Sequence, residues 1–90
     1  MAKLISKELE VLNRAGIHAR PASEIAKTAS SFSSDIFFEK DDMKINAKSI
    51  MGIITLGATY KTKIRCTCSG PDEKEAMAAL DDLFERRFET

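Results

Sequence analysis

The sequence predicts an α+β domain in which helices cover one face of an antiparallel sheet. Two observations lead to this prediction. Four segments have the partial alternation of apolar and polar residues that is typical of strands, and three segments with helical spacing or helix-start residues lie between and after them. The resulting order of elements is βαββαβα. Neither a repeat nor a linker interrupts this order, so residues 1–90 are expected to form a single small domain.

The first strand and the first helix are expected in the N-terminal third of the chain. Residues 3–11 predict the strand, because their apolar residues alternate in part: Leu4, Ile5, Leu9 and Val11. A loop over residues 13–16 follows. The helix is expected from Ala19 to about Ser31, with an apolar stripe at helical spacing: Ala22, Ile25, Ala26 and Ala29.

The middle of the chain predicts a hairpin and a short helix. Residues 35–39 and 43–46 have strand character, and the charged residues 40–42 between them favour a turn. Ser49 is then expected to open the short helix, because serine is among the preferred residues at that position.

The C-terminal third predicts a strand followed by a longer helix. Residues 61–69 alternate as a strand does, and the helix is expected to start at residues 71–73, where acidic groups complement its dipole. Its apolar stripe comprises Ala76, Leu80, Leu83 and Phe84. Arg86 and Arg87 suit its C-terminal end.

The charge balance and the hydropathy of the chain argue against several classes of protein. Fourteen basic and fourteen acidic residues cancel, so no overall field favours nucleic acid or an anionic membrane. No stretch approaches the roughly 20 apolar residues that a membrane span requires, and residues 1–7 lack the apolar core of a signal peptide. A cytoplasmic protein is expected.

The two cysteines are expected to be core residues. Cys66 and Cys68 alternate with polar residues and share one strand face with Ile64. A metal site is disfavoured, because no second group of cysteine or histidine residues completes one. Buried, reduced thiols are therefore predicted.

Residues 16–21 read Gly-Ile-His-Ala-Arg-Pro and contain the only histidine, His18. A neutral imidazole keeps a lone pair with which it can attack phosphorus. The first amides of the helix expected to follow would attract a phosphoryl group, and Arg20 would add a planar cation. These residues alone leave open a simpler interpretation, in which His18 only caps the helix or lies on the surface.

Three blocks of the sequence resemble the HPr family, the phosphocarriers of the bacterial phosphoenolpyruvate-dependent sugar phosphotransferase system. Residues 16–22 are similar to its phosphohistidine motif, residues 48–57 to its regulatory serine site, and residues 69–76 to the start of its last helix. The resemblance implies an open-faced sandwich. Its four-stranded antiparallel sheet has the order 1-4-2-3, with three helices on one face.

For His18 the resemblance implies reversible phosphoryl transfer. The imidazole, through Nδ1, would accept the group from enzyme I and pass it to sugar-specific IIA domains, while Arg20 stabilises the phosphate. Such a protein is an intermediate in a relay rather than an enzyme, and it needs neither a metal nor an organic cofactor. Nothing in the sequence demands more than a monomer.

Ser49 has two interpretations that are compatible with each other. Its hydroxyl suits an N-cap, and the resemblance implies that a dedicated HPr kinase/phosphorylase phosphorylates this serine in some bacteria. A phosphate there would be tolerated by the helix dipole and would act by repelling partners.

The second helix contains too many apolar residues to bury on one face, so some are expected on the surface. The resemblance implies one docking face around His18, formed by Ala19, Arg20, Ser23, Lys27, Ile50, Met51 and Ile54. The alternative is that the apolar members belong to the core.

Two residues depart from the family pattern, and two other functions stay open. Lys61 stands where a glycine is common, which puts the turn geometry in doubt, and Glu24 stands where an apolar residue is usual. One alternative function is an HPr-like carrier in a regulatory or nitrogen-linked phosphorelay. The other is a regulatory module in which His18 and Arg20 only bind an anion.

Overall fold

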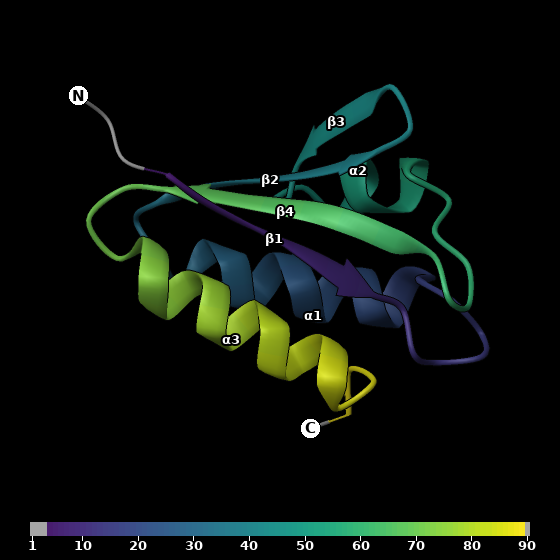
Figure 1. The fold of residues 1–90 in the computed structure, drawn as a ribbon. Helices are drawn as coiled ribbons and strands as arrows, with labels where there is room; N and C mark the ends of the chain where they lie inside the picture. Colours follow the sequence, from purple (N-terminus) through teal and green to yellow (C-terminus); the bar gives the residue numbers. More distant parts are fainter. Residues whose placement is uncertain (1–3, 90) are drawn as a thin grey trace.

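The computed structural model describes residues 4–89 and contains one four-stranded antiparallel sheet of order β1-β4-β2-β3. Helices α1 and α3 run side by side beneath one face of this sheet (Figure 1). In chain order the elements are β1 (Ile5–Glu10), α1 (Ala19–Ser30), β2 (Asp35–Lys40), β3 (Met43–Asn46), α2 (Ile50–Thr55), β4 (Lys63–Ser69) and α3 (Glu73–Glu85). The predicted fold class, element order and strand order are confirmed.

The three helices bury their apolar stripes in a single core. The predicted stripes of α1 and α3 are buried throughout, and α2 packs against α1 and β3 and adds Ile53 to the same core. Phe38 of β2 meets Phe84 of α3 edge to face, with ring centroids 5.8 Å apart. The opposite face of the sheet consists mainly of exposed polar side chains, as in an open-faced sandwich.

Three predicted boundaries differ from the observed ones. β4 begins at Lys63 rather than at residue 61, because Lys61 has φ = 70° and cannot continue an extended strand. The hairpin turn comprises only residues 41 and 42, since Lys40 still pairs with Met43. β1 runs from Ile5 to Glu10, so Leu4 and Val11 of its predicted range lie outside the strand, and residue 3 lies outside the described residues.

Both cysteines are fully buried and free, as predicted. The hydrogen bond with Cys68, together with burial, raises the pKa of the Cys66 thiol well above its usual range. The described part of the chain holds no group of three or more potential metal ligands. It also contains no helix long and apolar enough to cross a membrane.

Asp72 ties the start of α3 to the loop that follows α1. Its carboxylate accepts hydrogen bonds from the amides of Ser33 and Ser34, both at 2.9 Å, and from both hydroxyls. The Ser34 hydroxyl contributes most to lowering the pKa of Asp72 to about 2, followed by the Ser33 amide. The carboxylate thus connects the C-terminal end of α1 to the N-terminal end of α3, whereas His18 lies at the opposite end of α1.

Candidate functional site

His18 is the residue that immediately precedes α1. Its backbone is extended, its imidazole is exposed, and its side chain makes no capping hydrogen bond. The first helical bond runs from the amide of Ala22 to the carbonyl of His18 at 2.9 Å. The amides of Ala19 and Arg20 belong to the first helical turn and have no intrahelical partner, while Pro21 has no N–H to leave unpaired. The His18 imidazole therefore makes no capping hydrogen bond and lies beside backbone amides that have no partner within the helix.

A closed loop positions this imidazole. The amide of Gly16 donates to the carbonyl of Asn13 at 3.0 Å, and the Asn13 side-chain amide donates to the carbonyl of Gly16 at 2.6 Å. Gly16 has φ = 74°, and a Cβ at that position would lie 2.9 Å from the carbonyl oxygen of Ala58. Only glycine combines this conformation with this close approach. The loop predicted over residues 13–16 is thus present, and it packs on the segment after α2.

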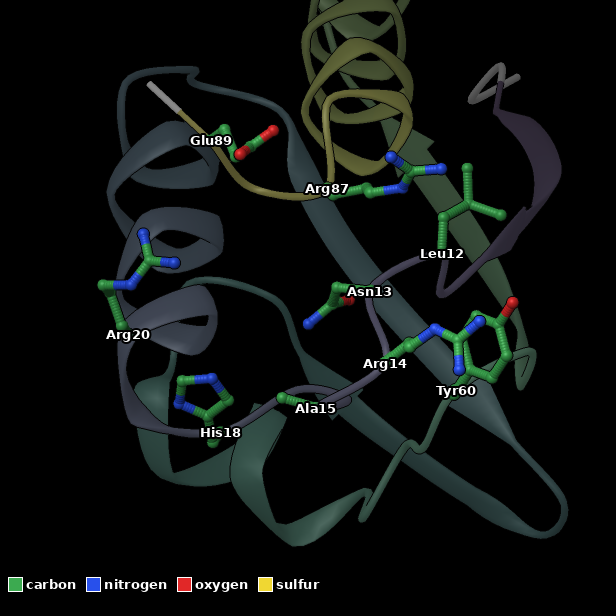
Figure 2. A pocket seen from close by; sticks show the side chains of 9 residues that line it. All are labelled: Leu12, Asn13, Arg14, Ala15, His18, Arg20, Tyr60, Arg87 and Glu89. Atoms are coloured by element: carbon green, nitrogen blue, oxygen red, sulfur yellow. The ribbon is translucent and has the colours of Figure 1, made fainter.

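The hollow beside His18 has a volume of about 540 Å³. Figure 2 shows His18 and Arg20 on one side, Arg14 and Tyr60 on another, and Asn13 between them. The complete lining is Leu12, Asn13, Arg14, Ala15, His18, Arg20, Tyr60, Arg87 and Glu89. Because three of these residues are arginines, the hollow attracts anions.

Seven of the nine lining residues were not singled out as site residues from the sequence, among them Arg14, Tyr60, Arg87 and Glu89. Arg14 and Tyr60 come from different loops, and the guanidinium carbon lies 5.7 Å from the ring centroid. Arg87 was expected at the end of the last helix, but it lies beyond that end with φ = 56°, and Glu89 is two residues further along the chain. Phe88 could have indicated that the chain turns back after Arg86, the C-cap of α3. A large apolar residue at this position is expected to be buried.

Ser49 is the N-cap of α2, as predicted. Its side-chain oxygen accepts a hydrogen bond from the amide of Gly52 at 3.0 Å. The neighbouring Lys48 donates to the carbonyl of Phe32 at 2.9 Å, which links the start of α2 to the segment after α1. Ser49 itself is exposed, so its hydroxyl combines a structural role with access from solvent.

Three apolar side chains of α2 lie on the surface. The exposed fractions are 42% for Ile50, 70% for Met51 and 38% for Ile54, whereas Ile53 and Leu56 are buried. The expectation that some apolar residues are exposed is confirmed, and the alternative that all of them are core is wrong. The other residues expected on the docking face are also exposed: Ala19, Arg20, Ser23 and Lys27. Because α2 packs against α1, both sets belong to adjacent helices.

Comparisons with known proteins agree along nearly the whole chain. A family model described as the PTS HPr component phosphorylation site matches residues 5–86. The phosphocarrier protein HPr of Treponema pallidum is 43% identical over 86 residues, which are 96% of this chain and 98% of that protein. The HPr-like protein Crh of Halalkalibacterium halodurans is 42% identical over 83 residues, covering 92% and 99%.

Solved structures give the same result. A crystal structure of HPr from Thermoanaerobacter tengcongensis superposes with a TM-score of 0.90 at 48% sequence identity. The match covers 93% of this chain and 94% of that one.

Proposed function

The chain belongs to the HPr family of phosphocarrier proteins, and we propose that His18 accepts a phosphoryl group from enzyme I and passes it to sugar-specific IIA domains. One observation carries the proposal. The exposed His18 imidazole makes no capping bond, and it shares an arginine-lined hollow with Arg20 at the start of α1. The relay begins with phosphoenolpyruvate, so we assign it to the cytoplasm.

The transfer is a nucleophilic exchange between two imidazoles. The Nδ1 lone pair of His18 forms a bond to phosphorus while the nitrogen–phosphorus bond of the donor histidine breaks, and its electron pair returns to the donor ring. Negative charge on the phosphoryl oxygens is stabilised by the Arg20 guanidinium and by the free amides at the start of α1. The carrier needs no metal or organic cofactor for this step.

The exposed apolar side chains of α2 support a docking role. A partner seated on Ile50, Met51 and Ile54 would exclude water that otherwise hydrolyses the phosphohistidine. The polar and charged side chains of Arg20, Ser23 and Lys27 on α1, beside the small Ala19, would set its orientation. Met51 suits a surface that several partners share, because its side chain adapts to different shapes.

Ser49 is proposed as a site of regulation by an HPr kinase/phosphorylase. A phosphate on this N-cap oxygen would be compatible with the helix dipole, so the fold would persist. The added charge would lie on the same helix as Met51 and would repel acidic partners. Docking, rather than the chemistry at His18, would therefore be affected.

The test is the intact mass of the protein after incubation with enzyme I, magnesium and phosphoenolpyruvate. We expect a gain of one phosphate that is lost in mild acid and is absent from the His18→Ala variant. If a competent enzyme I produces no gain, the non-covalent anion-binding module becomes the better hypothesis. In that case His18 binds an anion without forming an acid-labile bond.

A second candidate is a carrier in a regulatory or nitrogen-linked phosphorelay. The similarity to the HPr-like protein Crh supports this candidate, because relatives of this chain include proteins that are named HPr-like rather than HPr. Both candidates accept the phosphoryl group on His18, so they differ only in the acceptor. Transfer from the phosphorylated protein to purified IIA domains of sugar permeases supports the first candidate, and transfer only to regulatory domains supports the second.

A further inference from the structure

Three guanidinium groups line the hollow beside His18, and none of them forms an ion pair within residues 4–89. Arg14, Arg20 and Arg87 provide these groups, and Glu89 provides the one carboxylate of the lining. The chain as a whole has zero net charge. Positive charge is therefore concentrated at this hollow, and unpaired guanidinium groups are donors that match phosphate oxygens.

Arg14 is held at the wall of the hollow by an aromatic ring. Its guanidinium carbon lies 5.7 Å from the Tyr60 ring centroid, and the Lys61 ammonium lies 5.4 Å from the same centroid. A guanidinium group over a ring still presents its N–H edge to other partners. Arg14 is thus positioned without using the donors that an anion would need.

Arg87 reaches the hollow through a strained turn. Arg87 and Phe88 have φ values of 56° and 64°, which are uncommon for residues other than glycine. The turn is anchored because Phe88 is fully buried, with its ring centroid 4.9 Å from that of Phe84. Figure 2 shows Arg87 and Glu89 on the C-terminal segment after α3, which runs along one side of the hollow. The turn therefore adds a cation that a continuing helix would carry elsewhere.

We propose that this hollow reversibly binds small phosphate monoesters, with Arg14 and Arg87 as phosphate-binding side chains in addition to Arg20. A bound ester then competes with phosphoryl acceptance at His18, and this competition rests on the proposed function. The volume of about 540 Å³ falls within the roughly 300–1,000 Å³ of small-molecule sites and is larger than a phosphate ion requires. Leu12 and Tyr60 provide surface for the organic part of the ester.

The binding test is a titration of the ¹⁵N-labelled full-length protein followed by NMR. The probes are glucose 6-phosphate, inorganic phosphate and neutral glucose. We expect saturable shifts from glucose 6-phosphate at residues 12–15, 60 and 87, weaker binding of inorganic phosphate and none of glucose. Shifts confined to His18 and Arg20, or equal affinity for inorganic phosphate, would overturn the assignment to an ester.

Variants distinguish binding by the Arg14 and Arg87 side chains from a general effect of positive charge on the protein. The Arg14→Gln/Arg87→Gln double variant should bind the ester about tenfold more weakly, as expected for the loss of one or two charge-assisted hydrogen bonds. Glu89→Gln should bind it more tightly, because the variant removes the opposing charge. Arg65→Gln is the control, since Arg65 is exposed on the open face of β4. Equal affinity of the double variant and the control would refute the proposal.

The competition is measured as the initial rate of His18 phosphorylation by enzyme I. Glucose 6-phosphate should raise the apparent KM for this protein and leave kcat unchanged. An ester that binds but leaves this KM unchanged refutes the competition. If enzyme I fails to phosphorylate His18 while the ester binds as described, the proposed function fails and the binding site stands.

Discussion

The amide of Ile17 donates a hydrogen bond to the carbonyl of Ala58 at 3.0 Å. The residue before His18 is thereby tied to the segment that follows α2, the helix with the exposed apolar side chains. Gly16 lies in the same contact, because its Cα faces that carbonyl and the neighbouring Thr59. The position of the imidazole and the position of the apolar surface are therefore coupled through a backbone contact, and substitutions in this contact should affect both.

Gly16→Ala is expected to destabilise the protein and to slow phosphoryl acceptance. The variant places a Cβ 2.9 Å from the carbonyl oxygen of Ala58 at φ = 74°. The left-handed conformation costs about 1–2 kcal/mol, and crowding adds to it, for a total of roughly 3 kcal/mol. Urea unfolding measures this change in the free energy of unfolding.

Gly57→Ala is the matched control for Gly16→Ala. Gly57 has φ = 64°, but a Cβ there would meet nothing within 4 Å. Its cost should be only the conformational one, about 1–2 kcal/mol, with the rate of phosphoryl acceptance unchanged. Equal effects of the two variants on stability and rate would show that the contact with Ala58 is unimportant.

Lys61→Gly should stabilise the protein. Lys61 has φ = 70°, which glycine adopts without a steric cost. The gain is expected to be roughly 0.5–1 kcal/mol, reduced by the greater freedom of glycine in the unfolded chain and by the lost contact with Tyr60. Thermal unfolding measures it. Lys61→Ala loses the same contact and keeps the strained backbone, so it should be no more stable than the parent; a Lys61→Gly variant that is no more stable than Lys61→Ala would contradict this explanation.

The sequence predicted the regular elements well, because most have a periodic apolar pattern and α2 starts at a preferred N-cap residue. The stripe of α1 and that of α3 are buried as expected, and Ser49 caps α2 through its side chain. Lys61 is a different case. The sequence raised doubt about this turn, and the structure shows that a lysine adopts the left-handed conformation there, so that β4 begins two residues later than expected.

The hollow beside His18 could not be assembled from the sequence. Arg14, Tyr60 and Arg87 lie in three segments that are far apart in the chain, and no periodic pattern relates loop residues to one another. Their proximity depends on the close contact at Gly16 and on the burial of Phe88. Both are tertiary interactions, and local propensity does not specify them.

Asp72 should make the stability of the protein sensitive to acid. Hydrogen bonds from Ser34 and Ser33 lower the pKa of its carboxyl from 3.8 to about 2 in the folded protein. Because the folded pKa is the lower one, the unfolded chain binds the proton more readily, and the stabilisation is present above about pH 4 and is lost as the pH falls towards 2. Urea unfolding from pH 2 to 7 measures this dependence.

Two variants separate Asp72 from the other carboxylates. Asp72→Asn should be less stable at neutral pH and should lose less stability on acidification, since it has no charge to neutralise. Ser34→Ala removes the main hydrogen-bond donor, so the carboxyl pKa, followed by NMR, should rise. An unchanged pKa in Ser34→Ala would rule out the proposed cause.

Ser49 should allow stability and phosphoryl transfer to be changed separately. Ser49→Ala removes the side-chain acceptor of the Gly52 amide and should cost about 1 kcal/mol. Ser49→Asp keeps an acceptor at the N-cap and adds a negative charge that the helix dipole favours, so its stability should stay close to that of the parent. The added charge lies on the helix that carries Met51, so Ser49→Asp should raise the KM for transfer from enzyme I while Ser49→Ala leaves it unchanged. Thermal unfolding and transfer kinetics on the same samples test this separation.

A Ser49→Asp variant with parental KM would argue against control of docking by charge at this serine, whereas an equal rise of KM in both variants would trace the effect to the lost cap.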